Sequence, residues 1–153
     1  MADSVLVLTR LGGVATWRAL RRGSSWREIR QALDTGGVVR VNRGRYALPL
    51  ADEARVAGAR LTGTVSHTSA AVHWGWAVAR TPAEPHVTVS PRRHIAAARR
   101  EGVRVHWRVL EPSEICDGWV TSPARTVIDC CLDLPFDEAL AVVDSSWRAG
   151  LKP

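Results

Sequence analysis

Five histidines are the residues of this 153-residue chain whose chemistry is most versatile: His67, His73, His86, His94 and His106. The first two are six residues apart, which is a poor spacing for one face of a helix. No His-Glu-x-x-His, Cys-x-x-Cys or Walker loop is present. The sequence therefore predicts scattered, hydrogen-bonded histidines, no metal site and no cofactor. It also predicts no enzymatic activity, because no nucleophile with a matching base can be named.

Charge is distributed unevenly along the sequence. Residues 1–50 contain nine arginines and three carboxylates, whereas residues 51–153 contain twelve basic and twelve acidic residues. The whole net charge of +6 therefore lies in the first third of the chain. A segregated positive excess is typical of a protein that binds a polyanion. We expect nucleic acid rather than a membrane, because no basic amphipathic segment carries a broad apolar face.

Three short helices are expected to position these arginines. The first covers about residues 5–11 and ends at Gly12-Gly13. The second covers residues 17–22, with Thr16 as its N-cap and Gly23 as a left-handed residue after its end. A turn then leads into the third helix, so the second and third helices have the order of a helix-turn-helix.

The third predicted helix, over about residues 25–35, carries the candidate base contacts. Ser25 with Glu28 three residues later is the pattern of a capping box. Trp26 and Ile29 fall on an apolar face, which we expect to be core, and the opposite face is long, polar and cationic. In a helix-turn-helix such a face enters the major groove, where arginine pairs with guanine and glutamine with adenine. The candidate DNA-binding residues of this helix are Ser25, Arg27, Arg30 and Gln31.

The pattern of residues 38–48 predicts a β-hairpin that turns at Asn42-Arg43-Gly44. Arginines lie at and beside this turn, where they would contact phosphates or the minor groove as the wing of a winged helix. The candidate residues are Arg40, Arg43 and Arg45. The expected fold class is thus α+β, with a winged helix-turn-helix that binds double-stranded DNA over residues 1–50.

The stretch GGVATWRALRRGSSWREIRQALDTGGVVRVNRGRYALP resembles the N-terminal winged-helix domain of AbiEi-type antitoxins, the antitoxin halves of type IV toxin–antitoxin systems. Three features carry the resemblance: Gly12-Gly13-Val14-Ala15, a helix that starts near Ser25, and the RGRYALP segment over residues 43–49. The segments SHTSAA (residues 66–71) and SPARTVID (residues 122–129) are similar to those that follow this domain in actinobacterial relatives.

The resemblance implies an autorepressor that binds inverted repeats in its own operon. It also implies a functional partner, a nucleotidyltransferase toxin that the antitoxin opposes without stable binding. Many relatives continue into a domain that resembles very-short-patch repair endonucleases, and this sequence ends at Pro153 without one. Two other hypotheses therefore stay open. As alternatives to the repressor, the chain is the DNA-targeting part of a nuclease-like protein whose catalytic domain is absent, or it is a module that binds another protein.

Residues 51–153 are expected to form a second, small α+β domain of unknown role. Helices are predicted over residues 52–61, 66–76, 122–132 and 136–149, and strands over 85–91 and 102–110. In the second strand Arg104, His106 and Arg108 lie opposite an apolar face. Asp129 is expected to face outward or cap a neighbour and to pair with Arg125. Trp74 and Trp76 are expected in the core, and the basic residues 92–94 and 99–100 in a solvated loop.

Targeting signals are not apparent in the sequence. The first ten residues lack the basic and long apolar regions of a signal peptide, and no apolar run approaches the roughly eighteen residues of a spanning helix. An odd number of cysteines, two of them adjacent at Cys130 and Cys131, suits no disulfide framework, so we expect reduced, buried thiols. These observations predict a cytoplasmic protein.

Overall fold

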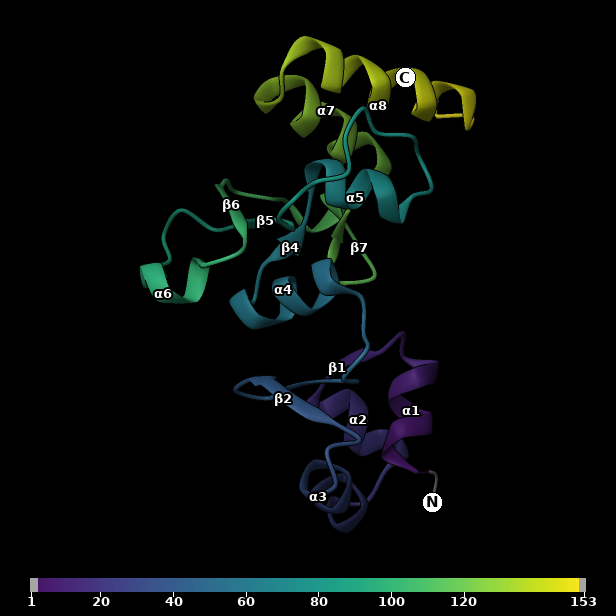
Figure 1. Ribbon diagram of the computed structural model, residues 1–153, viewed down its shortest axis with the longest axis vertical. Coiled ribbons are helices and arrows are strands. Elements are labelled where there is room, and N and C mark those ends of the chain that lie inside the picture. The colour runs from purple at the N-terminus through teal and green to yellow at the C-terminus, as the bar shows by residue number, and fades with distance from the viewer. Residues whose placement is uncertain (1–2, 152–153) are drawn as a thin grey trace. The chain divides into compact units, whose positions relative to one another are not determined.

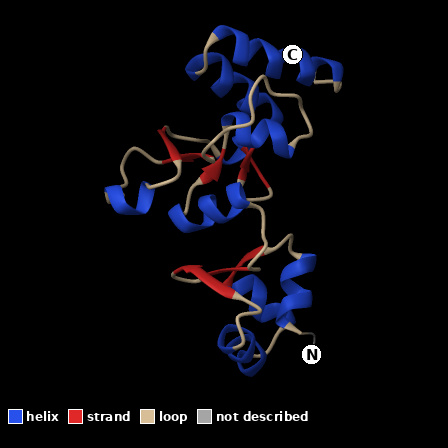
Figure 2. Cartoon of the chain, viewed as in Figure 1, coloured by secondary structure: helices blue, strands red, loops and turns tan. Residues whose placement is uncertain are grey.

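A computed structural model describes residues 3–151 and has a mixed α+β fold, as expected (Figure 1). The described residues form eight α-helices, one 3-10 helix and two β-sheets (Figure 2). The chain divides into two compact units, unit 1 over residues 1–60 and unit 2 over residues 61–153. None of the helices among residues 3–151 has the length and apolar character needed to cross a membrane.

Unit 1 combines three short helices with a small antiparallel sheet of strand order β1-β3-β2. The strand β1 lies between the first two helices in sequence and pairs with β3, so that Val14 opposes Ala47. The strands β2 and β3 form the expected hairpin, with a register shift between Arg40 and Asn42. The elements are α1 (Ser4–Arg10), β1 (Val14–Thr16), α2 (Trp17–Gly23), α3 (Trp26–Asp34), β2 (Val39–Asn42), β3 (Arg45–Ala47) and α4 (Glu53–Leu61).

Side-chain caps start the helices of unit 1 where the sequence predicts. The Thr16 hydroxyl accepts a hydrogen bond from the Ala19 N–H at 3.2 Å. The capping box of α3 is complete, because the Ser25 hydroxyl accepts from the Glu28 N–H and the Glu28 carboxylate accepts from the Ser25 N–H. Each such cap satisfies backbone donors that the first turn of a helix leaves without partners.

Gly23 has a different role from the one predicted. It is the last residue of α2 and does not adopt the left-handed conformation. Gly44 in the hairpin turn does adopt that conformation, with a φ of +68°. A Cβ atom at Gly23 would lie 2.9 Å from a methyl carbon of Val7. The glycine is therefore required for the close approach of α2 to α1 rather than for a turn.

The core of unit 1 lies between the three helices and the sheet. Its fully buried side chains are Leu8, Leu20, Ile29 and Val38. Trp26 was expected on the core face of α3, but its side chain is 55% exposed. Trp26 is the first residue of α3, and the Arg30 guanidinium lies 5.3 Å from its ring centre.

The helix α4 belongs to unit 1 up to Arg60, so the units divide there rather than after Leu50. Ala59 packs with Val14 and Ala47. The Arg55 guanidinium donates to the carbonyl oxygens of Leu11 and Gly12 at 2.8 and 2.9 Å. These contacts use carbonyl groups that the end of α1 leaves without helical partners.

Unit 2 is built on a mixed sheet of strand order β6-β5-β4-β8-β7. The pairs β5–β6 and β4–β8 are parallel, and the pairs β4–β5 and β7–β8 are antiparallel. Its elements are β4 (Thr64–Val65), α5 (His67–His73), β5 (His86–Val89), α6 (Ala97–Arg100), β6 (Arg104–Trp107), the 3-10 helix η1 (Pro112–Glu114), β7 (Ile115–Cys116), β8 (Val120–Thr121), α7 (Pro123–Asp133) and α8 (Phe136–Arg148).

Three helices of unit 2, α5, α7 and α8, pack against one another (Figure 1). Their shared core contains Ala71, Trp76, Cys130 and Val142, with Trp74 packed at its edge. The prediction of a core position is confirmed for Trp76, whereas Trp74 is only partly buried. Cys130 is buried as expected, whereas Cys131 is exposed, because neighbouring helical positions point in different directions.

Candidate nucleic-acid interface and histidine cluster

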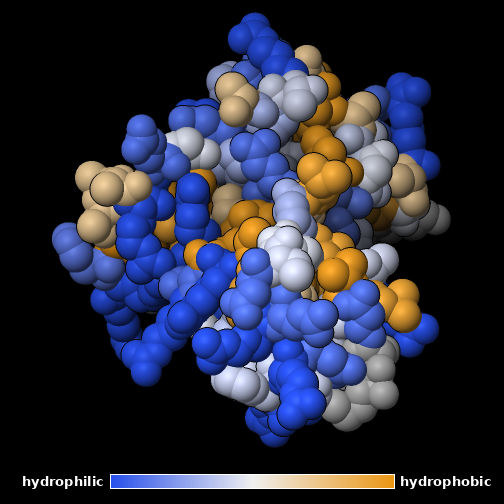
Figure 3. All heavy atoms as spheres, turned by 60° about the horizontal axis from the view of Figure 1, so that its bottom comes forward, coloured by the Kyte–Doolittle hydropathy of each residue, from blue (hydrophilic) through white to orange (hydrophobic). Residues whose placement is uncertain are grey.

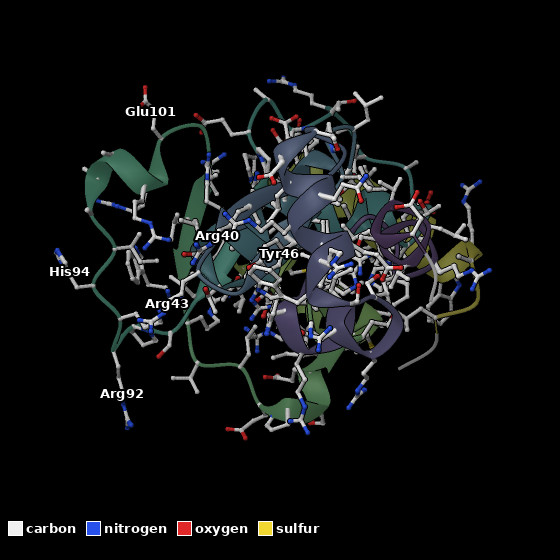
Figure 4. The ribbon with its side chains drawn as sticks, turned by 90° about the horizontal axis from the view of Figure 1, so that it is seen from below. Arg40, Arg43, Tyr46, Arg92, His94 and Glu101 are labelled. Atoms are coloured by element: carbon white, nitrogen blue, oxygen red, sulfur yellow. The ribbon has the colours of Figure 1, made fainter. Side chains whose placement is uncertain are left out.

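The β2–β3 hairpin of unit 1 holds its arginines at a well-anchored turn. The Asn42 side-chain amide accepts from the Arg43 N–H at 2.7 Å and donates to the Arg60 carbonyl at 2.9 Å. The Gly44 carbonyl accepts from the Trp17 N–H at 2.8 Å, which joins the hairpin turn to the start of α2. Arg40 and Arg43 are exposed and Arg45 is half-buried (Figure 4).

The outer face of α3 is the second candidate surface. Arg27 and Arg30 are exposed, and Trp26 lies beside them. Ser25 is half-buried and takes part in the capping box. Figure 3 turns the α3 end of unit 1 toward the viewer, and hydrophilic side chains cover much of that face. Arg27 and Arg30 are therefore exposed, as predicted. Trp26, which the helical periodicity assigned to the core, is exposed beside them.

Gln31, the fourth candidate on this helix, is exposed but has different neighbours. It lines a shallow hollow together with Asp3 and Glu28. Carboxylates next to a candidate DNA contact repel phosphate groups. Gln31 therefore lies beside two carboxylates on one side and one helical turn after Arg27 on the other.

Within the described residues, the arginines of the first third form no salt bridges with carboxylates. Among residues 3–151, salt bridges are found for Arg108, Arg125 and Arg148 of unit 2, but for none of the nine arginines between Arg10 and Arg45. Eight of these nine are exposed. The positive charge that the sequence places in the first third is therefore solvent-exposed and not neutralised by carboxylates of the described chain.

Unit 2 contains a second candidate site, a histidine cluster formed by His67, His86 and His106. His67 begins α5, His86 begins β5, and His106 lies in β6. Because His106 opposes Thr88, two residues beyond His86 on β5, both strand histidines point to the same face of the sheet. One ring nitrogen from each of the three lies within 4.8 Å of the others.

Direct contacts hold the three rings together. His106 Nε2 lies 3.1 Å from His86 Nδ1, and the rings of His67 and His106 stack with centres 3.6 Å apart. His67 Nδ1 lies 2.8 Å from the Ser66 hydroxyl, and its Nε2 lies 2.9 Å from Asp133 Oδ2. The backbone of His67 has a φ of +50°, an uncommon value for a residue other than glycine.

A network of arginines and carboxylates adjoins the histidine cluster. Arg108 donates to Asp129 at 2.6 Å and to Asp133 at 3.1 Å. Arg125 also donates to Asp129, at 2.5 and 2.9 Å, and to Glu114 at 3.1 Å. The predicted Arg125–Asp129 pair is confirmed. The prediction that Asp129 faces outward is wrong, because its side chain is fully buried between the two arginines.

Burial keeps the clustered histidines neutral at physiological pH. It lowers the pKa of His86 to about 3 and that of His106 to about 4, and the neighbouring histidines add to both shifts. Burial also lowers the pKa of His67, against the opposing effect of its hydrogen bond to Asp133. Neutral imidazoles have a lone pair that can accept a hydrogen bond or bind a metal ion.

A hollow of about 390 Å³ opens beside His86. It is lined by one buried hydroxyl and by charged side chains, which include Arg80, Glu84 and Arg104. The hydroxyl belongs to Thr68, whose Oγ1 is buried and has no hydrogen-bond partner within the described part of the chain. The hollow connects the histidine cluster to a polar surface.

Sequence reasoning predicted scattered histidines, and for three of the five that prediction is wrong. His67, His86 and His106 come from separate elements, and only the pairing of β5 with β6 and the packing of α5 bring them together. The alternation of β6 did place Arg104, His106 and Arg108 on one face. His106 and Arg108 on that face belong to the polar network of unit 2. Trp107 and Val109 on the other face are exposed.

The basic loop between β5 and β6 is solvent-exposed for the most part, as predicted. Arg92, His94 and Glu101 project outward (Figure 4). Arg93 instead donates to the Thr62 carbonyl at 2.7 Å.

No protein-family model matches this chain, and no curated protein is significantly similar to it. The resemblance to AbiEi-type antitoxins accordingly stays a prediction.

Proposed function

We propose that unit 1 is a winged helix-turn-helix that binds double-stranded DNA. The main support is the set of exposed arginines without carboxylate partners in the first fifty residues. The proposal is also supported by the order of the elements, in which α2 and α3 are separated by two residues and are followed by a hairpin. In this arrangement α3 enters the major groove and the hairpin turn reaches the neighbouring backbone.

The roles of the arginines follow from their positions. Arg27 and Arg30 lie on the outer face of α3 and read base edges, and Trp26 contacts the sugar–phosphate backbone with its exposed ring. Arg40, Arg43 and Arg45 neutralise phosphates or enter the minor groove. Gln31, one helical turn after Arg27 on α3, is a further candidate base contact, with the carboxylates of Asp3 and Glu28 beside it.

We further propose that the chain represses its own operon and serves as an antitoxin-like regulator. The resemblance to AbiEi-type antitoxins supports this role, and the partner it implies is a nucleotidyltransferase toxin. The test is a binding measurement with labelled duplex from the region upstream of the gene and a scrambled duplex of equal length. We expect tighter binding to the upstream duplex. Equal binding to both would rule out sequence-specific repression and leave non-specific DNA binding.

Replacing Arg27 with alanine is expected to weaken binding to the cognate duplex by about 1–3 kcal/mol, because one bidentate base contact is lost. Binding to the scrambled duplex should change much less, so the ratio of the two dissociation constants falls. Fluorescence anisotropy with both duplexes measures the ratio. Arg92→Ala, which removes an exposed arginine of unit 2, is the matched control. An unchanged ratio in Arg27→Ala would remove Arg27 from the base contacts.

Replacing Arg43 with alanine is expected to weaken binding to all duplexes alike, because a phosphate contact carries no sequence information. The slope of log K against log salt concentration should become shallower by about 0.9, the value for one phosphate contact on duplex DNA. Titrations at four or more salt concentrations measure the slope. A variant that loses affinity for the cognate duplex alone would instead identify Arg43 as a base contact.

A further inference from the structure

The histidine cluster has a composition and geometry that suit a transition-metal ion. Three neutral imidazoles are a common ligand set for zinc, and hard ions such as Mg²⁺ prefer oxygen ligands. Two nitrogens bound tetrahedrally to one zinc ion at about 2.0–2.1 Å lie about 3.3–3.4 Å apart. The 3.1 Å between His106 Nε2 and His86 Nδ1 is close to that separation.

Asp133 is placed to orient the ring of His67 and lies near that of His106. Its Oδ2 lies 2.9 Å from His67 Nε2 and 3.7 Å from His106 Nδ1. Histidines that bind a metal usually donate their other ring N–H to an oxygen, often that of a carboxylate. The nitrogens that face away from Asp133 are then His67 Nδ1 and His106 Nε2, and the second of these is the one beside His86 Nδ1.

The carboxylates next to the cluster leave one oxygen directed at it. Arg108 contacts Oδ1 of Asp133, and Oδ2 of Asp133 faces His67. Arg104, Arg108 and Arg125 balance the charges of Glu114, Asp129 and Asp133, and Arg104 also acts on His86 and His106. The case for a metal ion therefore depends on the ligand geometry and not on an excess of negative charge.

We propose that His67, His86 and His106 bind one Zn²⁺ ion, each through one ring nitrogen, with Asp133 as the carboxylate that positions the ring of His67. Binding requires the stacked rings of His67 and His106 to rotate, because a metal–nitrogen bond lies in the plane of the imidazole, and it requires His67 Nδ1 to exchange its hydrogen bond with the Ser66 hydroxyl for the metal. The fourth position of the ion faces the hollow beside His86. The Thr68 hydroxyl, buried and without a partner among residues 3–151, lines this route and can hydrogen-bond a zinc-bound water.

The test is a titration of the purified, chelator-treated protein with Zn²⁺ in the absence of DNA. We expect one equivalent to bind, and excess Mg²⁺ not to displace it. His86→Gln and His106→Gln should each weaken binding by more than the roughly 10–100-fold that loss of an outer partner costs, and Asp133→Asn by about that amount. His94→Gln, an exposed histidine outside the cluster, is the matched control and should bind as the wild type does.

A nitrogen-15 NMR spectrum of the wild-type histidine rings keeps the proposal testable if the variants fail to fold. Zinc should shift ring nitrogens of His67, His86 and His106 and leave those of His73 and His94 unchanged. No binding of Zn²⁺, equal binding in all variants, or shifts at His73 and His94 in place of the cluster would each overturn the proposal. None of these results would bear on DNA binding by unit 1, which the titration does not involve.

Discussion

Replacing Asp129 with alanine is expected to lower the free energy of unfolding of unit 2 by about 3–5 kcal/mol, the usual cost of removing one partner from a buried ion pair. The carboxylate is fully buried and receives hydrogen bonds from both Arg108 and Arg125. Its loss leaves the half-buried guanidinium groups with one carboxylate each, Asp133 for Arg108 and Glu114 for Arg125. Such a loss is a large share of the roughly 5–15 kcal/mol that keeps most domains folded.

Urea denaturation followed by tryptophan fluorescence measures this change. The matched control is Asp144→Ala, which removes the carboxylate of an exposed pair with Arg148 on α8. Because both partners of that pair are largely in solvent, the control should cost less than about 1 kcal/mol. Equal losses in the two variants would mean that burial of the Asp129 network adds nothing to stability. Asp129→Asn keeps the volume of the side chain and serves if the alanine variant does not fold.

The affinity of the chain for duplex DNA is expected to fall about 10³-fold between 50 and 200 mM monovalent salt. The excess charge of +6 in residues 1–50 matches about six phosphate contacts, and each contact releases condensed counterions. The slope of log K against log salt concentration should accordingly be near −5, about −0.9 per phosphate. The salt dependence of the affinity thus distinguishes DNA binding from binding to a protein partner, because counterion release is the source of the slope.

A triple variant with alanine at positions 40, 43 and 45 tests where those contacts lie. Its slope should be shallower by about three times the value for one phosphate. Arg92→Ala changes the net charge without touching unit 1 and should leave the slope nearly unchanged. A complex whose affinity does not depend on salt, or the absence of any duplex binding at 50 mM salt, would contradict the proposed function and favour a protein-interaction module.

Local signals in the sequence predicted most of the helices and the hairpin strands of this chain, but not the short strands β1, β4, β7 and β8. The caps at Thr16 and Ser25 depend on residues within three positions of one another, so the local sequence is enough to predict where α2 and α3 start. The same is true of the hairpin turn at Gly44 and of the proline that begins α7. The mixed α+β class follows from these elements alone.

The composition of the buried polar site could not be predicted in this way. Its members come from α5, β5, β6 and α7, and their proximity is set by strand pairing and helix packing rather than by spacing. Asp129 looked exposed because carboxylates seldom lie inside a protein without partners, and its partner Arg108 is 21 residues away in sequence. Trp26 shows the reverse error, since helical periodicity marks an apolar face but not where that face is covered.

The double anchoring of the hairpin turn bears on the thermodynamics of recognition. Hydrogen bonds from the Trp17 N–H to Gly44 and from the Asn42 amide to Arg60 hold this turn in place before any ligand arrives. A loop that is already ordered loses little backbone entropy on association, whereas a disordered arm must be immobilised as it binds. The side chain of Arg43 is then the main part of the turn left to order, and calorimetry should record only a small entropic penalty from this element.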